Sequence, residues 1–164
     1  MNQDIEEIPF TGFWLLFGVF VVLALLFPLL AYLETQGLIQ EENPGPVWFN
    51  WVMTIIFFLV TLFLYQFRQL RIEYKLGVLL VGYSFLRSKI LFNDIESVEL
   101  DTSNALWSFG GYGLRTRFYR GKVHIVYNIP AKKCVKITLK NKKKIFIFST
   151  NKPDYWLARL KQPI

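Results

Sequence analysis

Two long runs without a charged residue restrict what the first part of the chain can fold into. The first covers residues 10–33 and the second covers residues 47–67. As α-helices they extend about 36 Å and about 31 Å, enough to cross a hydrocarbon core of about 30 Å. In lipid only helices and closed barrels satisfy the backbone hydrogen bonds, and two segments cannot close a barrel. We therefore expect a hairpin of two membrane-spanning helices within residues 1–67.

The distribution of charge predicts how this hairpin is oriented. Residues 1–67 contain six acids and no lysine or arginine, whereas residues 68–164 contain all 19 basic residues and six further acids. Basic residues close to membrane spans are enriched on the cytoplasmic side, and Arg68, Arg71 and Lys75 directly follow the second run. The sequence predicts a multi-pass protein of the cytoplasmic (inner) membrane with both termini in the cytoplasm. A secretory signal begins with bases, so we expect the acidic N-terminus and the first span to be retained.

The side chains available for chemistry are few. One cysteine, Cys134, cannot form an internal disulfide, and one histidine, His124, leaves too few ligands for an ordinary zinc or iron site. The glycine-rich residues 110–113 lack the Lys-Ser/Thr ending of a phosphate loop, and the acids of residues 94–101 are typical of a solvated strand edge. We expect no cofactor, no metal site and no enzymatic activity.

From residue 68 onward, short segments rich in Val, Ile, Tyr and Phe alternate with turn residues, a pattern that predicts strands. Val135, Ile137 and Leu139 share one strand face and Lys136 and Thr138 the other, as in a half-buried antiparallel strand. A capping segment with an early proline then precedes helical periodicity over residues 155–161. The predicted strands are residues 69–75, 78–83, 86–92, 95–100, 122–128, 134–140 and 144–149. The expected fold is a membrane α-helical hairpin (1–67) followed by an all-β domain (68–164) of about seven antiparallel strands, capped by a C-terminal helix.

This order of elements resembles the membrane-anchored bacterial pleckstrin-homology-like (PH-like) domain proteins. The resemblance covers roughly residues 68–162 and rests on loose hydrophobic patterns in residues 89–100, 110–115, 135–144 and 149–153. It implies a domain that binds proteins or lipid surfaces and has no chemistry of its own. Two departures are lysines in the last hairpin, where glycine is common, and no basic cluster across the first hairpin at residues 75–77.

The basic residues of the β domain are the candidate contact surface. They fall into two groups along the chain: Arg115, Arg117, Arg120 and Lys122, and Lys132, Lys133, Lys136, Lys140, Lys142, Lys143 and Lys144. Phe118, Tyr119 and Tyr127 are interleaved with these bases and could stack on nucleic acid. A domain tethered without a flexible linker instead favours the anionic lipids of the inner leaflet or an acidic partner. A third interpretation is a solvated surface that only sets orientation.

The sequence therefore predicts a non-enzymatic, membrane-anchored binding or scaffolding module. Its expected partners are anionic membrane lipids and a membrane protein or a second copy of the chain, and not nucleic acid. The alternative is an accessory or regulatory subunit of a larger membrane complex, in which the aromatic-rich helices make the functional contact.

Overall fold

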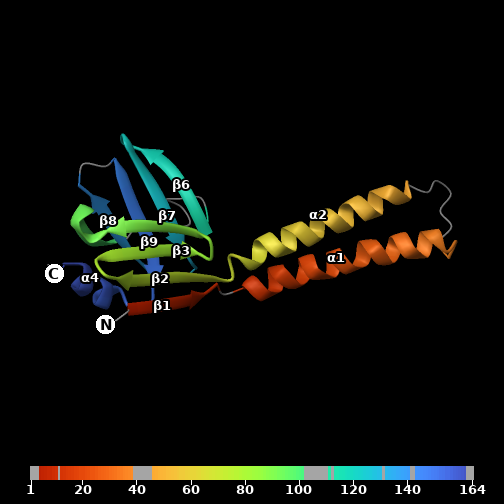
Figure 1. Ribbon diagram of the computed structural model, residues 1–164, viewed down its shortest axis with the longest axis horizontal. Helices are drawn as coiled ribbons and strands as arrows, with labels where there is room; N and C mark the ends of the chain where they lie inside the picture. Colours follow the sequence, from red (N-terminus) through yellow and green to blue (C-terminus); the bar gives the residue numbers. More distant parts are fainter. Residues whose placement is uncertain are drawn as a thin grey trace. The chain divides into compact units, whose positions relative to one another are not determined.

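The computed structural model describes residues 4–10, 12–38, 46–101, 111, 113–130, 132–140 and 143–161, which form helices and strands grouped into two units (Figure 1). The hairpin unit is residues 12–68, and the β unit comprises residues 1–11 together with residues 69–164. The elements are β1 (Asp4–Pro9), α1 (Phe13–Thr35), α2 (Val47–Tyr65), β2 (Gln69–Lys75), β3 (Val78–Tyr83), β4 (Leu86–Leu91), the 3-10 turn η1 (Phe92–Asp94), β5 (Ile95–Asp101), β6 (Gly113–Tyr119), β7 (Lys122–Asn128), β8 (Lys133–Leu139), β9 (Lys144–Thr150) and α4 (Pro153–Lys161).

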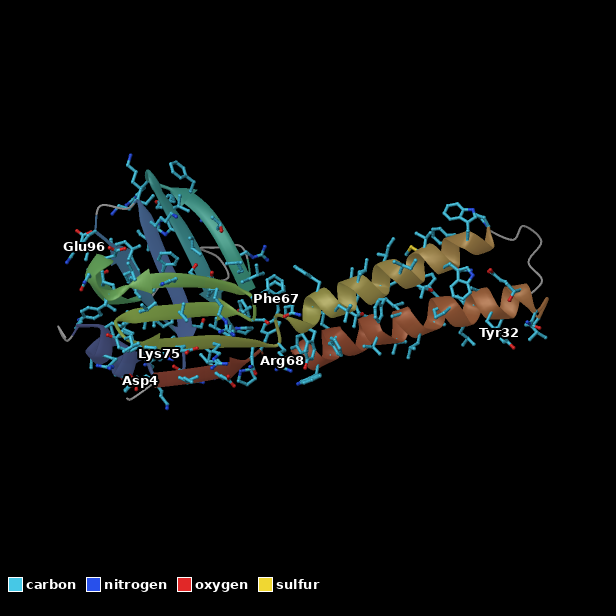
Figure 2. All side chains as sticks on the ribbon, in the orientation of Figure 1. Asp4, Tyr32, Phe67, Arg68, Lys75 and Glu96 are labelled. Atoms are coloured by element: carbon cyan, nitrogen blue, oxygen red, sulfur yellow. The ribbon has the colours of Figure 1, made fainter. Side chains whose placement is uncertain are left out.

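The two helices of the hairpin unit are long and apolar enough to cross a membrane. The spans Phe13–Thr35 and Trp48–Tyr65 have hydropathies of 2.7 and 1.9, and only 6% and 0% of their most apolar windows are buried. A core helix of a soluble protein is mostly buried, so this exposure suits lipid-facing helices. Apolar side chains extend from both helices along their length (Figure 2).

Contacts between α1 and α2 hold the hairpin unit together. The ring of Phe57 lies 5.2 Å from that of Phe27 and 6.1 Å from that of Phe20, measured between centroids. Near the end of α1, the carboxylate of Glu34 accepts a hydrogen bond of 2.8 Å from the amide of Asn50 on α2. Interhelical hydrogen bonds of this kind help helices associate in lipid, where the hydrophobic effect provides no drive.

The β unit contains two sheets. The first is antiparallel with strand order β1-β2-β3-β4, and the second has the order β5-β8-β9-β7-β6. Their facing sides meet at Tyr83, whose hydroxyl donates a hydrogen bond of 2.9 Å to the carbonyl of Asn128, and whose ring lies 6.2 Å from that of Tyr127. The short helix α4 buries Trp156 and Leu160.

All seven strands predicted from the sequence are present to within a residue at each end. The predicted C-terminal helix is present as α4, which begins two residues before the predicted range 155–161. Two further strands, β1 and β6, were not predicted, and one pair, β7 with β9, is parallel rather than antiparallel. In β8 the predicted alternation is confirmed, because Val135, Ile137 and Leu139 are buried while Lys136 and Thr138 are half-buried.

The sequence predicts that residues 1–11 are part of the hairpin segment, but they belong to the β unit. Strand β1 pairs antiparallel with β2 along its whole length, from Asp4 opposite Tyr74 to Pro9 opposite Gln69. The two chain connections to the helical hairpin therefore start from adjacent, paired residues of one sheet. The predicted domain boundary at residue 68 would therefore separate β1 from the sheet to which it belongs.

A buried carboxylate fixes β1 to the rest of the β unit. Glu6, which is 7% exposed, accepts hydrogen bonds from the Thr150 hydroxyl (2.7 Å), the Asn151 backbone N–H (2.8 Å) and the Trp156 indole N–H. A buried charge is tolerated when hydrogen bonds replace its hydration, and Glu6 has three such bonds. It therefore joins β1 to the end of β9 and to the start of α4.

A second pair of charges reinforces the same contact. Arg159 on α4 donates a hydrogen bond of 2.8 Å to the carboxylate of Asp4. Partial burial raises the pKa of Asp4, but the hydrogen bonds from Arg159 and Tyr155 and the charge of Arg159 outweigh this effect and hold the pKa below its ordinary value. Asp4 therefore favours the folded state above its ordinary pKa, and this contribution is lost as the pH falls through the lowered value.

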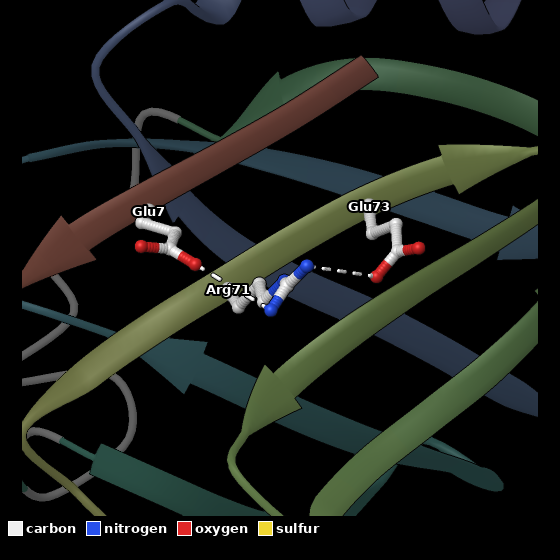
Figure 3. Close-up of polar contacts among 3 residues, drawn as sticks. All are labelled: Glu7, Arg71 and Glu73. Carbon is white, nitrogen blue, oxygen red and sulfur yellow. Dashed lines mark ion pairs between the residues drawn. The ribbon is translucent and has the colours of Figure 1, made fainter. Parts of the chain in front are cut away.

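The contrast between Glu6 and its neighbour Glu7 gives a direct test. Glu7 points to the other face of the sheet, where Arg71 lies 3.5 Å from it and 3.6 Å from Glu73 (Figure 3). Glu6→Ala leaves buried donors unsatisfied and is expected to lower the free energy of unfolding by about 1–3 kcal/mol or more. Glu7→Ala removes a partly exposed ion pair and should cost at most about 1 kcal/mol. Denaturant unfolding of the detergent-solubilised chain, followed by circular dichroism, measures both; equal losses would contradict the role of Glu6.

Candidate functional site

The turn between β6 and β7 places several cations at one end of the second sheet. Tyr119 lies opposite Lys122, and the two residues between them, Arg120 and Gly121, have φ values of 49° and 73°. Positive φ at both central positions is typical of a tight two-residue hairpin turn, in which glycine is favoured and arginine is uncommon. The turn thus holds the Arg120 side chain at the tip of the hairpin.

An exposed tyrosine organises two of these cations. The guanidinium carbon of Arg117 lies 5.4 Å from the centroid of the Tyr119 ring, and that of Arg120 lies 5.1 Å from it. Both distances are within the range of cation–π attraction. Next to Tyr119, the side chain of Phe118 is 74% exposed.

The parallel pairing of β7 with β9 brings the second basic group to the same place. The Val123 backbone N–H donates a hydrogen bond of 2.7 Å to the carbonyl of Lys143, and Val123 lies opposite Lys144. Groups of basic residues that lie far apart in the sequence therefore meet at one end of the sheet. We name this surface the basic tip; it comprises Arg117, Tyr119, Arg120, Lys122, Lys143 and Lys144.

Within the described part of the chain, Arg120, Lys122, Lys143 and Lys144 form no ion pair with an acid. Close positive charges repel one another, and this repulsion is relieved when an anion binds among them. The basic tip is therefore suited to an anionic group.

Lys132, Lys133 and Lys136, which the sequence also predicts as contact residues, lie away from the basic tip. Lys133 begins β8 opposite Thr150, the last residue of β9, so Lys132 and Lys133 are at the opposite end of the sheet from Lys144. Lys136 is in the middle of β8 and its ammonium lies 3.4 Å from the carboxylate of Glu99. Three further positions complete the set. Arg115 is exposed on β6, and Lys142 lies outside the described residues. Lys140 follows β8 at the same end of the sheet as Lys144, and its backbone N–H donates to the carbonyl of Asp94.

The basic tip is remote from the strand ends that lead to the helices. Those ends, Pro9 and Gln69, adjoin the row that pairs Leu70 with Tyr83, and the hydroxyl of Tyr83 contacts Asn128 at the end of β7. The tip lies at the other end of β7, about 20 Å from Asn128 along the strand at about 3.3 Å per residue. Within the β unit, the tip and the chain connections thus lie at opposite ends of β7.

The side chains that the sequence offers for chemistry or for base stacking are in surroundings that suit a structural role. Burial raises the pKa of the Cys134 thiol, which the hydrogen bond with Ser149 only partly offsets, and a buried thiol with a raised pKa is a poor nucleophile. Tyr127, an aromatic candidate for stacking, is buried and its hydroxyl lies 2.8 Å from that of Ser88. Among the residues that the structure describes, no cluster of three or more His, Cys, Asp or Glu side chains suits a metal ion.

No protein-family model matches this chain, and no curated protein or solved structure matches it either.

His124 on β7 reports on the charges around the tip. Burial lowers the pKa of His124, and the charges of Lys136, Arg117 and Lys122 lower it further, against the opposing charge of Asp101. The unfolded chain therefore binds a proton at His124 more readily than the folded chain does. Stability is thus expected to fall as the pH drops below the ordinary histidine pKa.

His124→Gln tests this effect cleanly, because His124 is the only histidine in the chain. The variant should lose less stability than the original chain between pH 7 and pH 5, since no other side chain ordinarily changes charge across that interval. Thermal unfolding midpoints of both proteins at the two pH values give the comparison. An equal decrease in both proteins would show that His124 does not experience these charges.

Proposed function

We propose that this chain is a membrane-anchored, non-enzymatic binding or scaffolding module of the bacterial cytoplasmic membrane, with a PH-like β domain. The two apolar helices and the β unit, with its two sheets and C-terminal helix, support this proposal. The strand before the helices and the parallel pair β7–β9 are departures from the expected PH-like arrangement.

The observation that carries the proposal is the basic tip. Two groups of cations, separate in the sequence, are brought together around exposed Tyr119 and Phe118. An anionic group bound there would relieve the repulsion among these cations. We favour an acidic protein as this ligand over leaflet lipids, because a protein can also pack apolar side chains against the exposed rings of Tyr119 and Phe118.

The pairing of β1 with β2 supports the same side of the membrane for both termini. The chain leaves the sheet at Pro9 and returns at Gln69, opposite each other in the register. A single crossing would place these two residues on different sides. The hairpin is therefore proposed to cross twice, with the β unit on the cytoplasmic side, where the basic residues belong.

Reporter fusions test this topology. A reporter joined after Ile164 should be active only in the cytoplasm, and one inserted near Glu42, which lies outside the described residues, only on the outer side. A fusion joined before Asp4 should give the same result as the one after Ile164. The reverse pattern, or opposite sides for the two ends, would overturn the arrangement.

A charge-reversal experiment tests the proposed function. The tagged full chain is recovered in mild detergent after cross-linking, with Arg120, Lys143 and Lys144 changed to Glu in one variant and Lys132 and Lys133 changed to Glu in the control. The control lies at the opposite end of the same sheet. Recovery of an acidic partner should fall at least about tenfold, equivalent to about 1.4 kcal/mol, in the first variant only.

The same experiment separates the proposal from its alternative. A stoichiometric membrane partner that is recovered equally with both variants would favour an accessory subunit whose helices make the contact. Loss of recovery in both variants would show a nonspecific effect of charge and would overturn the assignment to the basic tip.

A further inference from the structure

Strand β6 lies at the edge of the second sheet and is open to the surroundings. It pairs with β7 on one side, and no strand in the described part of the chain pairs with its other side. Every residue from Arg115 to Tyr119 is exposed. The outer edge of such a strand presents backbone N–H and C=O groups in a row, which is the template that an extended peptide uses to add a strand.

The two faces of β6 differ in chemistry. Successive side chains of a strand point to opposite faces, so Arg115, Arg117 and Tyr119 share one face while Thr116 and Phe118 share the other. The ring of Tyr119 lies beside the Arg117 guanidinium and favours its position on the first face. A strand added beside β6 would meet cations on one face and the exposed ring of Phe118 on the other.

Charge complementarity indicates which kind of strand can pair with the outer edge of β6. A second copy of β6 added antiparallel would bring arginines of both copies onto one face, and like charges on neighbouring strands are destabilising. An acidic strand instead places carboxylates beside the arginines, in the charge-assisted pairs that guanidinium groups form well. Lipid headgroups offer charge but no backbone to pair with the strand edge.

We propose that β6 binds an extended acidic segment of a partner protein by strand addition. Acids of that segment alternate with apolar residues, so that the acids contact Arg115 and Arg117 and an apolar side chain contacts Phe118. This inference rests on the binding function proposed above and names the class of its partner. It extends the recognition surface from the basic tip along the edge of the sheet.

The probe is a fluorescently labelled peptide of alternating glutamate and valine, about as long as β6. The full chain is held in nanodiscs of neutral phosphatidylcholine, and binding is measured by fluorescence anisotropy. A matched peptide with N-methylated valines has the same charge but lacks part of the backbone donors. The unmodified peptide should bind at least about tenfold more tightly than its N-methylated form, because strand addition depends on main-chain hydrogen bonds.

Charge exchange tests the role of the arginines. Arg115→Glu combined with Arg117→Glu should abolish binding of the glutamate peptide and create binding of the corresponding lysine–valine peptide. Lys132→Glu combined with Lys133→Glu, on the far end of β8, is the matched control and should leave glutamate-peptide binding unchanged. Binding of the lysine peptide to the double arginine variant also shows that this variant is folded.

Three results would overturn strand addition. Equal binding of the N-methylated and unmodified peptides would show a purely electrostatic contact. Binding of the chain to anionic phosphatidylglycerol vesicles without any peptide binding would identify a lipid surface instead. If the peptide does not bind but reversing Arg120, Lys143 and Lys144 still abolishes partner recovery, the proposed binding function stands and its partner does not use β6. If the peptide does not bind and the reversal does not reduce recovery, the proposed function is rejected as well.

Discussion

The β unit depends on one buried carboxylate. Glu6 comes from the beginning of the chain, yet its three donors come from the end of β9, from the residue that follows, and from α4. A charged group in such surroundings is stable only while these donors are in place, and the donors are satisfied only while Glu6 is present. The first strand is therefore a structural part of the domain, and a fragment beginning at Arg68 would lack it.

The sequence predicted seven strands, including the edge strands β4 and β5, because short segments rich in Val, Ile, Tyr and Phe alternate with turn residues. The two strands that it did not predict, β1 and β6, are both at sheet edges. In β1 the usual pattern is reversed, since Ile5 is 44% exposed while Glu6 is buried. In β6 nothing from Arg115 to Tyr119 is buried, so periodicity carries no signal. The segments β1 and β6 are strands because of the strands with which they pair, and that information lies elsewhere in the chain.

The candidate surface was predictable in composition but not in arrangement. The sequence identified both groups of basic residues, and it placed Lys132 and Lys133 in the same group as Lys143 and Lys144. The structure separates these pairs to opposite ends of β8 and β9 and joins the second pair to Arg120 instead. The antiparallel pairing of β8 with β9 separates the two pairs, and the parallel pairing of β7 with β9 brings the second pair close to Arg120. Pairing between strands that are not consecutive is set by the packing of the whole domain, which local patterns do not contain.

The contact between β1 and the last helix also sets an order of events during synthesis. Glu6 and Trp156 are separated by 150 positions, so at about 5–20 residues per second the ribosome makes the first strand roughly 8–30 s before its final partner. Both membrane helices are translated within that interval. Strand β1 must wait with an unpaired edge until β2 appears, and its three acids, Asp4, Glu6 and Glu7, keep this edge soluble and discourage pairing with other nascent chains. The carboxylate that later completes the core thus also protects the unfinished chain.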